Sequence, residues 1–548
     1  MMTWWYLGFR LVVFLSVSGL VVYAALAVAR IMARGALTRT EILATAIVLA
    51  TGQVTVTQIL LGLFGLLTWW PVMALNGLLA SGLFLVARRR CLECPPRPDA
   101  GGEHPHDPVM WCIVLGVGVI MLVNLRKVLG VPPFGTDSLG YHLPIAVEWL
   151  QTGKTLIGND IPFTFYPGVS ELVDLWLLLP FRDSVLVNLQ NWPFALLTGL
   201  ALYNLARRAG ASIRWAAYGG LLFISIRAVQ VVLAFVDFQD NDVLIAAFFL
   251  AAINLGIAAV YSDNRTLLVG EGIALGLLAG AKYGGLGYAA LAGAVHIFLA
   301  VTQRKTRRLL RDITTIALVS FLIGGFWYVR NWIKVGNPLT PMTVQLAGHV
   351  IFPGRASIFE GVLYHSSILA KIAEPGAFRL FVDRALLEQG GMAVALSVPV
   401  LILITLRWGY RFLFLKRRSP LEAALYVLLP WGAFGLFMTT PLAAENVKGT
   451  LNQLQFGYSP IRYGLPFWAL GCFLLAGLLF DERWRQSWVP DVCTVLILTH
   501  SFVTMLPHQS EFSAPALSRF DLVAWLVLPA CAAVVERLRH TTPRRRWH

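Results

Sequence analysis

The chain has 548 residues, of which 57% are hydrophobic and 13% charged, and its formal net charge is +15. Soluble globular proteins carry about a quarter charged residues, so this composition excludes an ordinary soluble fold. Many apolar runs reach the roughly 20 residues that a helix needs to cross a bilayer. They are continuous rather than alternating, which indicates helices.

The apolar runs predict an all-α polytopic membrane protein with about 15 spans, in a range of about 13 to 15. In chain order the spans are expected near 8–30, 41–62, 66–87, 109–126, 184–206, 215–235, 241–261, 266–281, 284–301, 312–329, 391–407, 421–438, 461–480, 488–506 and 520–536.

The basic residues fall in alternate loops between these spans, which predicts that those loops face the cytoplasm. The N-terminus then lies outside and the C-terminus inside. Topology anchoring accounts for the positive charge without a nucleic-acid partner, although the tail could also contact anionic lipid. The residues concerned are Arg30, Arg34, Arg39, 88–90, Arg207, Arg208, Arg214, 304–311, 407–418, Arg483, Arg485 and 544–546.

Cys91 and Cys94 form a C-x-x-C pair that His104 and His106 follow. These four side chains could hold zinc tetrahedrally. The spacing matches no common zinc module, and the Pro- and Gly-rich stretch also suits a cytoplasmic linker. The cysteines imply no disulfide framework.

The outward segments carry mixed polar residues, and the first of them, 127–183, contains "GTDSLGYHLP". Asp137 lies in a turn composition that would hold a carboxylate at the membrane surface. Tyr141 and His142 follow four and five residues later. Helix capping by Asp137 is the alternative interpretation. One or two helices lying at the interface are expected in this segment.

Three aspartates, Asp237, Asp240 and Asp242, lie at the outer boundary in "FVDFQDND". Carboxylates this close together repel one another near lipid unless a cation balances them. Helix capping could explain one of the three. No cofactor is certain from the sequence, but Asp240 and Asp242 could bind a divalent cation, Mg or Mn.

Cations are expected at the same face: Lys282, Arg330 and Arg462. Snorkelling would be one explanation, and an anionic ligand is the other, because Lys and Arg are less frequent on the outward side. Segment 331–390 is the longest stretch without a span and contains an expected amphipathic helix at 376–389. Such a segment often covers or binds a substrate, and an interaction surface is the alternative.

Seven motifs occur in an order that resembles the GT-C superfamily of polytopic glycosyltransferases, in the branch of protein O-mannosyltransferases and the lipid A aminoarabinose transferase. The motifs are "TDSLGYHLPIAVEWLQTG", "YPGVSELVDLWLL", "NLQNWPFALLTGLALYNLARRAG", "QDNDVLIAAFFLAAI", "GLLAGAKYGGL", "WYVRNWIKVGNPLTP" and "RYGLPFWAL". The resemblance covers 109–480, which we interpret as the catalytic core. Residues 1–108 add three spans, and residues 481–548 hold the last spans and a basic tail.

The resemblance implies a sugar transferase that uses a polyprenyl-phosphate donor and a hydroxyl acceptor on protein, lipid or glycan, usually with inversion. It implies that Asp137 is the base; relatives often carry two adjacent acids there, whereas Thr136 and Ser138 flank this one. The second acidic region would map to Asp240 and Asp242, and the Arg462–Tyr463 pair matches an Arg-Tyr pair of the family.

A positioned carboxylate can accept the acceptor's proton, and cations can stabilise the leaving phosphate. Tyr141 and His142 are therefore candidate binders of sugar or phosphate, and Lys282, Arg330 and Arg462 of phosphate. The expected location is the bacterial inner membrane, with the site on the extracytoplasmic side. A transporter or flippase, an oligosaccharide ligase or polymerase, and a non-catalytic assembly subunit remain alternatives.

Overall fold

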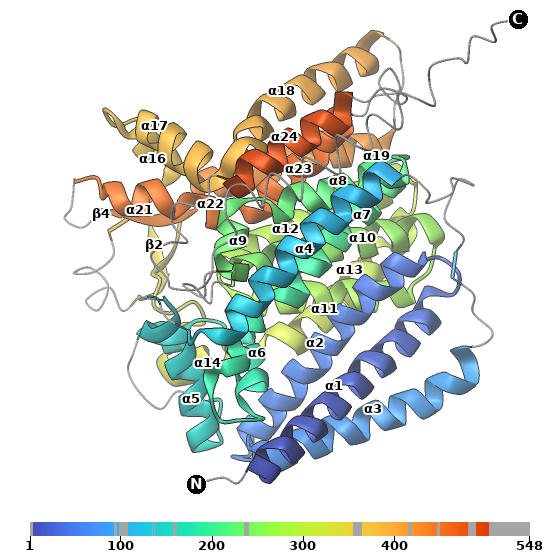
Figure 1. The fold of residues 1–548 in the computed structure, drawn as a ribbon, viewed down its shortest axis with the longest axis vertical. Helices are drawn as coiled ribbons and strands as arrows, with labels where there is room; N and C mark the ends of the chain where they lie inside the picture. Colours follow the sequence, from blue (N-terminus) through green and yellow to red (C-terminus); the bar gives the residue numbers. More distant parts are fainter. Residues whose placement is uncertain are drawn as a thin grey trace, which may run out of the picture.

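The computed structural model describes residues 4–91, 96–97, 108–133, 135, 137–156, 162–234, 241–354, 364–414, 419–445, 450–479 and 489–503. Long tilted helices form a bundle, and short helices and strands gather at one end of it, on the left of Figure 1.

The first three predicted spans are helices α1 (Trp4–Ala33), α2 (Arg39–Leu63) and α3 (Trp69–Cys91). Thr38 begins α2 with a capping box, in which its side chain and that of Glu41 each accept the other's backbone N–H. Helix α1 packs against both neighbours, and the three form the blue corner of the bundle (Figure 1). Helix α2 also packs against the rest of the protein.

Helix α10 (Asp242–Ser262) is the centre of the bundle. Its residues from Asp242 to Val260 are all buried, as expected for a helix that is hydrophobic on every side. Its one interior polar side chain, Asn254, donates to the carbonyls of Ala201 and Leu250 at 3.0 and 2.9 Å. Around it pack α7 (Trp192–Arg208), α11 (Thr266–Ala281), α12 (Gly284–Thr302) and α23 (Leu465–Leu479).

Two predicted spans are bent pairs rather than straight helices. The first pair is α8 (Ile213–Ile224) and α9 (Arg227–Ala234), bent by 71°. The second is α13 (Thr306–Gly324) and α14 (Phe326–Val335), bent by 62°. Gly324 and Gly325 stand at the second break, and such small residues are a common cause of sharp bends.

The remaining apolar helices are α4 (Pro108–Gly130), α18 (Gly391–Phe414) and α24 (Val489–Val503), with a continuous stretch formed by α19 (Pro420–Ala423), η5 (Ala424–Leu428) and α20 (Leu429–Thr439). Among the described residues, nine helices are long and apolar enough to cross a membrane, or up to 11 if each bent pair is one span. The protein is therefore an all-α polytopic integral membrane protein. The predicted number of about 15 spans is not confirmed, and the span expected at 520–536 lies outside the described residues.

The expected interfacial segments are short helices. Segment 127–183 contains η1 (Ser138–His142), α5 (Leu143–Thr152), η2 (Pro162–Phe165) and α6 (Val169–Leu178), and η3 (Ser184–Leu189) leads into α7. The helix expected at 376–389 is present as α17 (Ala377–Leu380) and η4 (Phe381–Gly390).

Two small antiparallel sheets of two strands each accompany these helices. Strand β1 (Val344–Leu346) pairs with β2 (His349–Phe352), and β3 (Tyr364–Ser367) pairs with β4 (Pro441–Glu445). The second sheet therefore ties segment 331–390 to the chain before α21 (Gln453–Tyr458) and α22 (Pro460–Tyr463). Helix α16 (Ile368–Ile372) follows β3 directly.

Helices α11 and α13 pack closely because α11 presents glycines at every fourth position. A Cβ on Gly276 would lie 2.6 Å from Ile323 Cβ and 2.7 Å from the carbonyl oxygen of Ser320, and one on Gly272 would lie 2.7 Å from Val319 Cβ. Small residues at this spacing let helix backbones approach each other in membranes.

Gly276→Ala is therefore expected to destabilise the protein by about 1–3 kcal/mol, because the added methyl group overpacks this crossing. The measurement is the thermal unfolding midpoint in detergent. Gly293→Ala on α12 is the matched control, since a Cβ there meets nothing within 4 Å. Equal midpoints for the two variants would contradict the close packing.

Candidate active site

The site is built around an ion pair between Asp137 and Arg462, which are 325 residues apart in the sequence. Arg462 Nη1 lies 2.8 Å from Asp137 Oδ2. The Asp137 side chain is 22% exposed and the Arg462 side chain 18%, so solvent still reaches the pair. Asp137 directly precedes η1, and Arg462 lies on α22, so the two polar loops of one bundle end meet here.

Tyr463 connects this pair to a second one. Arg462 Nη2 donates to the hydroxyl of Tyr463 at 3.1 Å, and the Arg462 Cζ atom lies 5.0 Å from the Tyr463 ring centroid. Lys282 Nζ lies 4.6 Å from the same centroid and 2.8 Å from Asp242 Oδ1. Two cations, each with its own carboxylate, therefore share one aromatic ring.

The start of α10 and the end of α11 hold the second pair in place. Asp242 is the first residue of α10, and Lys282 follows the last residue of α11. Asn241 Nδ2 donates to the carbonyl of Ala281 at 3.0 Å and so ties these two helix ends together.

The pKa of the Asp137 carboxyl is lower than its ordinary value. Burial on its own would raise the pKa of Asp137, but the charge and hydrogen bond of Arg462 and the charges of His142 and Lys282 outweigh it. Burial would likewise lower the pKa of Lys282, and Asp242 raises it above the ordinary value. Both groups are charged at neutral pH.

Tyr141 and His142 lie on η1, which Asp137 directly precedes. The Tyr141 ring stacks on Phe163, with centroids 4.4 Å apart, and lies 4.2 Å from the His142 ring. His142 is only 2% exposed, and its Nδ1 lies 2.6 Å from Glu171 Oε1. The buried imidazole is thus oriented by Glu171.

Arg330 is not brought to Asp137. It is buried, donates to the carbonyls of Thr164 and Tyr166 at 2.8 and 3.4 Å, and lies over the Trp327 ring at 5.0 Å. Its guanidinium therefore holds the loop around η2 in place. A contact with phosphate, as the sequence predicted for Arg330, remains a prediction.

The acidic cluster and the zinc candidates lie mostly beyond the described part of the chain. Asp237, Asp240, Cys94, His104 and His106 fall outside it. Within the described residues, no group of three or more His, Cys, Asp or Glu side chains could hold a metal ion. Asp242 instead pairs with Lys282.

Sequence reasoning missed two buried acids on α6. Glu171 and Asp174 are 4% and 0% exposed, and burial, together with the charge of Glu171, raises the pKa of Asp174 well above its ordinary value. Both acids lie in the quoted motif "YPGVSELVDLWLL". Their spacing of three residues, which puts them on one face of a helix, was the signal that could have identified them.

Sequence reasoning also missed Tyr283 and Asn331, which hold the loop around η2 by hydrogen bonds. The Tyr283 hydroxyl lies 3.0 Å from the carbonyl oxygen of Phe165 and 2.6 Å from that of Thr340. Asn331 Nδ2 donates to the same Phe165 carbonyl at 2.7 Å and to the Tyr283 hydroxyl at 3.1 Å. No local sequence pattern predicts these contacts.

The fold and site together define a polytopic membrane protein with acids and cations paired at one end of its bundle. The chain matches no protein-family model and no curated protein. Among solved structures it is similar to ArnT from Cupriavidus metallidurans in the apo state, with 19% identity over 78% of this chain and 70% of that one and a TM-score of 0.48.

The same enzyme bound to undecaprenyl phosphate gives 18% identity, the same coverages and a TM-score of 0.47. The archaeal oligosaccharyltransferase AglB from Archaeoglobus fulgidus, in complex with an inhibitory peptide and a dolichol-phosphate, gives 14% identity over 78% of this chain and 55% of that one, with a TM-score of 0.40. Similarity at this level says nothing of donor, acceptor or catalytic residues.

Arg330→Met should loosen the η2 loop, because buried carbonyls left without donors cost about 1–3 kcal/mol each. The expected result is faster amide hydrogen exchange across 163–166 than in the wild type. Arg307→Met, on the exposed side of α13, is the control and should leave that exchange unchanged. Unchanged exchange in Arg330→Met would mean that the guanidinium does not hold the loop.

Proposed function

We propose that the protein is an inverting glycosyltransferase that moves a sugar from a polyprenyl-phosphate donor to a hydroxyl acceptor at the extracytoplasmic face of the membrane. The observation that carries this proposal is the contact of Asp137 with Arg462, next to the Lys282–Asp242 pair on the other side of Tyr463. The outward orientation rests on the basic residues of the alternate loops.

The donor phosphate is expected to bind between Arg462 and Lys282. Both cations lie within 5.0 Å of the Tyr463 ring centroid, and a phosphate can accept charge-assisted hydrogen bonds from both. Since they stand at the ends of apolar helices, a polyprenyl chain attached to that phosphate can stay in contact with the bilayer.

Asp137 would serve as the general base. The acceptor oxygen forms a bond to the anomeric carbon while the bond from that carbon to the phosphate oxygen breaks, and the hydroxyl proton passes to the carboxylate. The leaving phosphate keeps the electron pair, and the two cations stabilise its negative charge. A single displacement of this kind inverts the anomeric centre.

Arg462 would couple donor binding to the basicity of Asp137. While it is paired with Asp137, it depresses the pKa of the carboxyl and so makes it a weak base. When a donor phosphate draws the guanidinium away, the basicity of Asp137 increases. The base would thus be strengthened when donor is in place, which limits the unproductive reaction with water.

The direct test is to incubate the purified protein with a panel of polyprenyl-phosphate sugars and to measure thermal stabilisation and sugar transfer, because a ligand that binds the native state raises its stability. Asp137→Asn should keep the unfolding midpoint and donor stabilisation but lose transfer by at least about 100-fold. Asp263→Asn, an exposed aspartate on another loop, is the matched control.

Full transfer by Asp137→Asn would remove this residue as the base. Failure of every donor in the panel to stabilise the wild type, together with no transfer, would remove the donor class as well.

The pH dependence gives a second test. Because the pKa of Asp137 lies below its ordinary value of 3.8, the carboxyl stays ionised to lower pH than a free aspartate, and the acid limb of the transfer rate should lie below that value. Arg462→Gln removes the main cation that opposes burial, so its acid limb should move to higher pH. The measurement is the transfer rate at donor concentrations well below saturation as a function of pH, because that rate reports the pKa of the donor-free protein.

Arg307→Gln is the charge-matched control and should keep the wild-type profile. An acid limb at the same pH in wild type and Arg462→Gln would show that Asp137 does not titrate in the reaction.

A further inference from the structure

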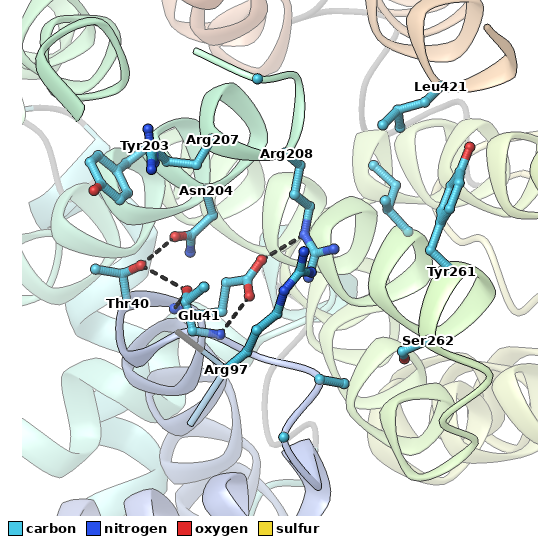
Figure 2. A pocket seen from close by; sticks show the side chains of 15 residues that line it. Thr40, Glu41, Arg97, Tyr203, Asn204, Arg207, Arg208, Tyr261, Ser262 and Leu421 are labelled. Atoms are coloured by element: carbon cyan, nitrogen blue, oxygen red, sulfur yellow. Dashed lines mark hydrogen bonds and ion pairs between the residues drawn. The ribbon is translucent and has the colours of Figure 1, made fainter. Parts of the chain in front are cut away.

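A cavity of about 610 Å³ lies away from the Asp137 site. The beginning of α2, the last turn of α7 and the end of α10 form its wall (Figure 2). Arg97 completes the lining, and its backbone N–H donates to the carbonyl of Leu37 at 2.8 Å, which holds this residue against the rest of the wall.

This cavity is at the opposite end of the bundle from the Asp137 site. Helix α10 starts at Asp242, which pairs with Lys282, and ends at Ser262, which lines the cavity. At a rise of 1.5 Å per residue its 21 residues span about 31 Å, which is the thickness of a bilayer's hydrocarbon core. By the distribution of basic residues, this end faces the cytoplasm.

The lining has an excess of positive charge. It contains Arg97, Arg207 and Arg208 and a single acid, Glu41. Figure 2 shows the side chains of Arg97 and Arg208 converging from two sides beside Glu41. Glu41 is already engaged, because Oε1 lies 2.6 Å from Arg208 Nε and Oε2 accepts the Thr38 backbone N–H at 2.8 Å.

Two buried donor atoms in the same wall lack an acceptor within the part of the chain that the structure describes. Asn204 is 2% exposed; its Oδ1 accepts from the Thr40 hydroxyl at 2.7 Å, while its Nδ2 has no hydrogen-bond partner. Arg208 Nη2 is also buried without one. Buried polar groups are normally satisfied, and what this wall lacks is acceptors. A group rich in acceptors would complete this wall, and the excess of arginines in the lining favours one with negative charge.

We propose that this cavity is an anion site that binds a phosphate group, carried either by an anionic lipid headgroup or by a soluble phosphate compound. Its volume is within the range of about 300–1,000 Å³ that is common for ligand pockets. Guanidinium groups match phosphate oxygens in geometry and charge. Ile257, Tyr261 and Leu421 form an apolar side of the same cavity that suits the uncharged part of the ligand.

The first arm of the test uses inorganic phosphate as the probe. Thermal unfolding of the purified protein is measured with sodium phosphate and with sodium chloride at equal ionic strength. Phosphate should raise the wild-type midpoint, and Arg97→Gln combined with Arg207→Gln should weaken the apparent affinity at least about tenfold, as expected for losing charged hydrogen bonds.

The matched control is Arg307→Gln combined with Arg311→Gln, which removes the same charge from exposed positions on α13. It should respond to phosphate like the wild type. If the double variant at the cavity fails to fold, Arg97→Gln alone replaces it, because the Arg97 side chain is exposed and its loss leaves the bundle intact.

The second arm distinguishes the two sources of phosphate. Protein is reconstituted in vesicles of equal parts phosphatidylglycerol and phosphatidylcholine, extracted, and examined by native mass spectrometry. Retention of phosphatidylglycerol that is lost in the cavity variant but kept in the control assigns the site to a lipid headgroup. A response to inorganic phosphate without such retention assigns it to a soluble compound.

The proposal is overturned if neither probe binds the wild type, or if both bind the cavity variant and the control alike. Neither result bears on sugar transfer at the other end of the bundle, since no residue of the cavity belongs to the Asp137 site.

Discussion

A charge placed inside an apolar bundle is costly unless an opposite charge or a hydrogen-bond partner meets it, and this constraint fixes how the helices of this protein come together. Five pairs of acidic and basic side chains in the described chain join residues that are distant in sequence. The pairs are Asp137–Arg462, Asp242–Lys282, Glu41–Arg208, Arg214–Asp491 and Glu271–His296. Each pair joins different elements, so satisfying a charge also sets the position of a helix or loop.

At the Asp137 end, the pairs remain partly open to solvent, and this makes them available for chemistry. A fully buried pair is locked, because separating it would leave an unpaired charge. Asp137 and Arg462 are 22% and 18% exposed. A phosphate can therefore reach Arg462 in place of Asp137, and an acceptor hydroxyl can reach Asp137 in place of Arg462. The fully buried His142 and Glu171 behind them supply the rigid support that such an exchange needs.

The two polar ends of the bundle have different compositions. At the Asp137 end Arg462 and Lys282 each have their own carboxylate, whereas at the other end three arginines line the cavity with one acid, Glu41, which pairs with Arg208. Helix α10 lies between them and is buried along almost its whole length. The apolar centre separates the two ends, and the polar loops at each end can therefore serve different ligands.

The resemblance of "TDSLGYHLP" and "RYGLP" to a family of transferases pointed to Asp137 and Arg462 from the sequence, and the apolar runs predicted most of the long helices. Hydrophobicity alone could do this because it is a local property: about 20 apolar residues identify a span wherever its neighbours lie. The bends at Ser225 and Gly325 were not predicted, since a run of apolar residues continues through them.

The tertiary structure decided which polar groups meet. The sequence predicted that Arg330 contacts phosphate together with Lys282 and Arg462, whereas in the structure its guanidinium donates to the carbonyls of Thr164 and Tyr166. It gave no role to Glu171, which orients His142, or to Arg97, whose backbone N–H donates to the carbonyl of Leu37 beside the cavity. Composition and spacing determine that these residues lie near a membrane boundary, but a partner hundreds of residues away is chosen only by how the helices pack.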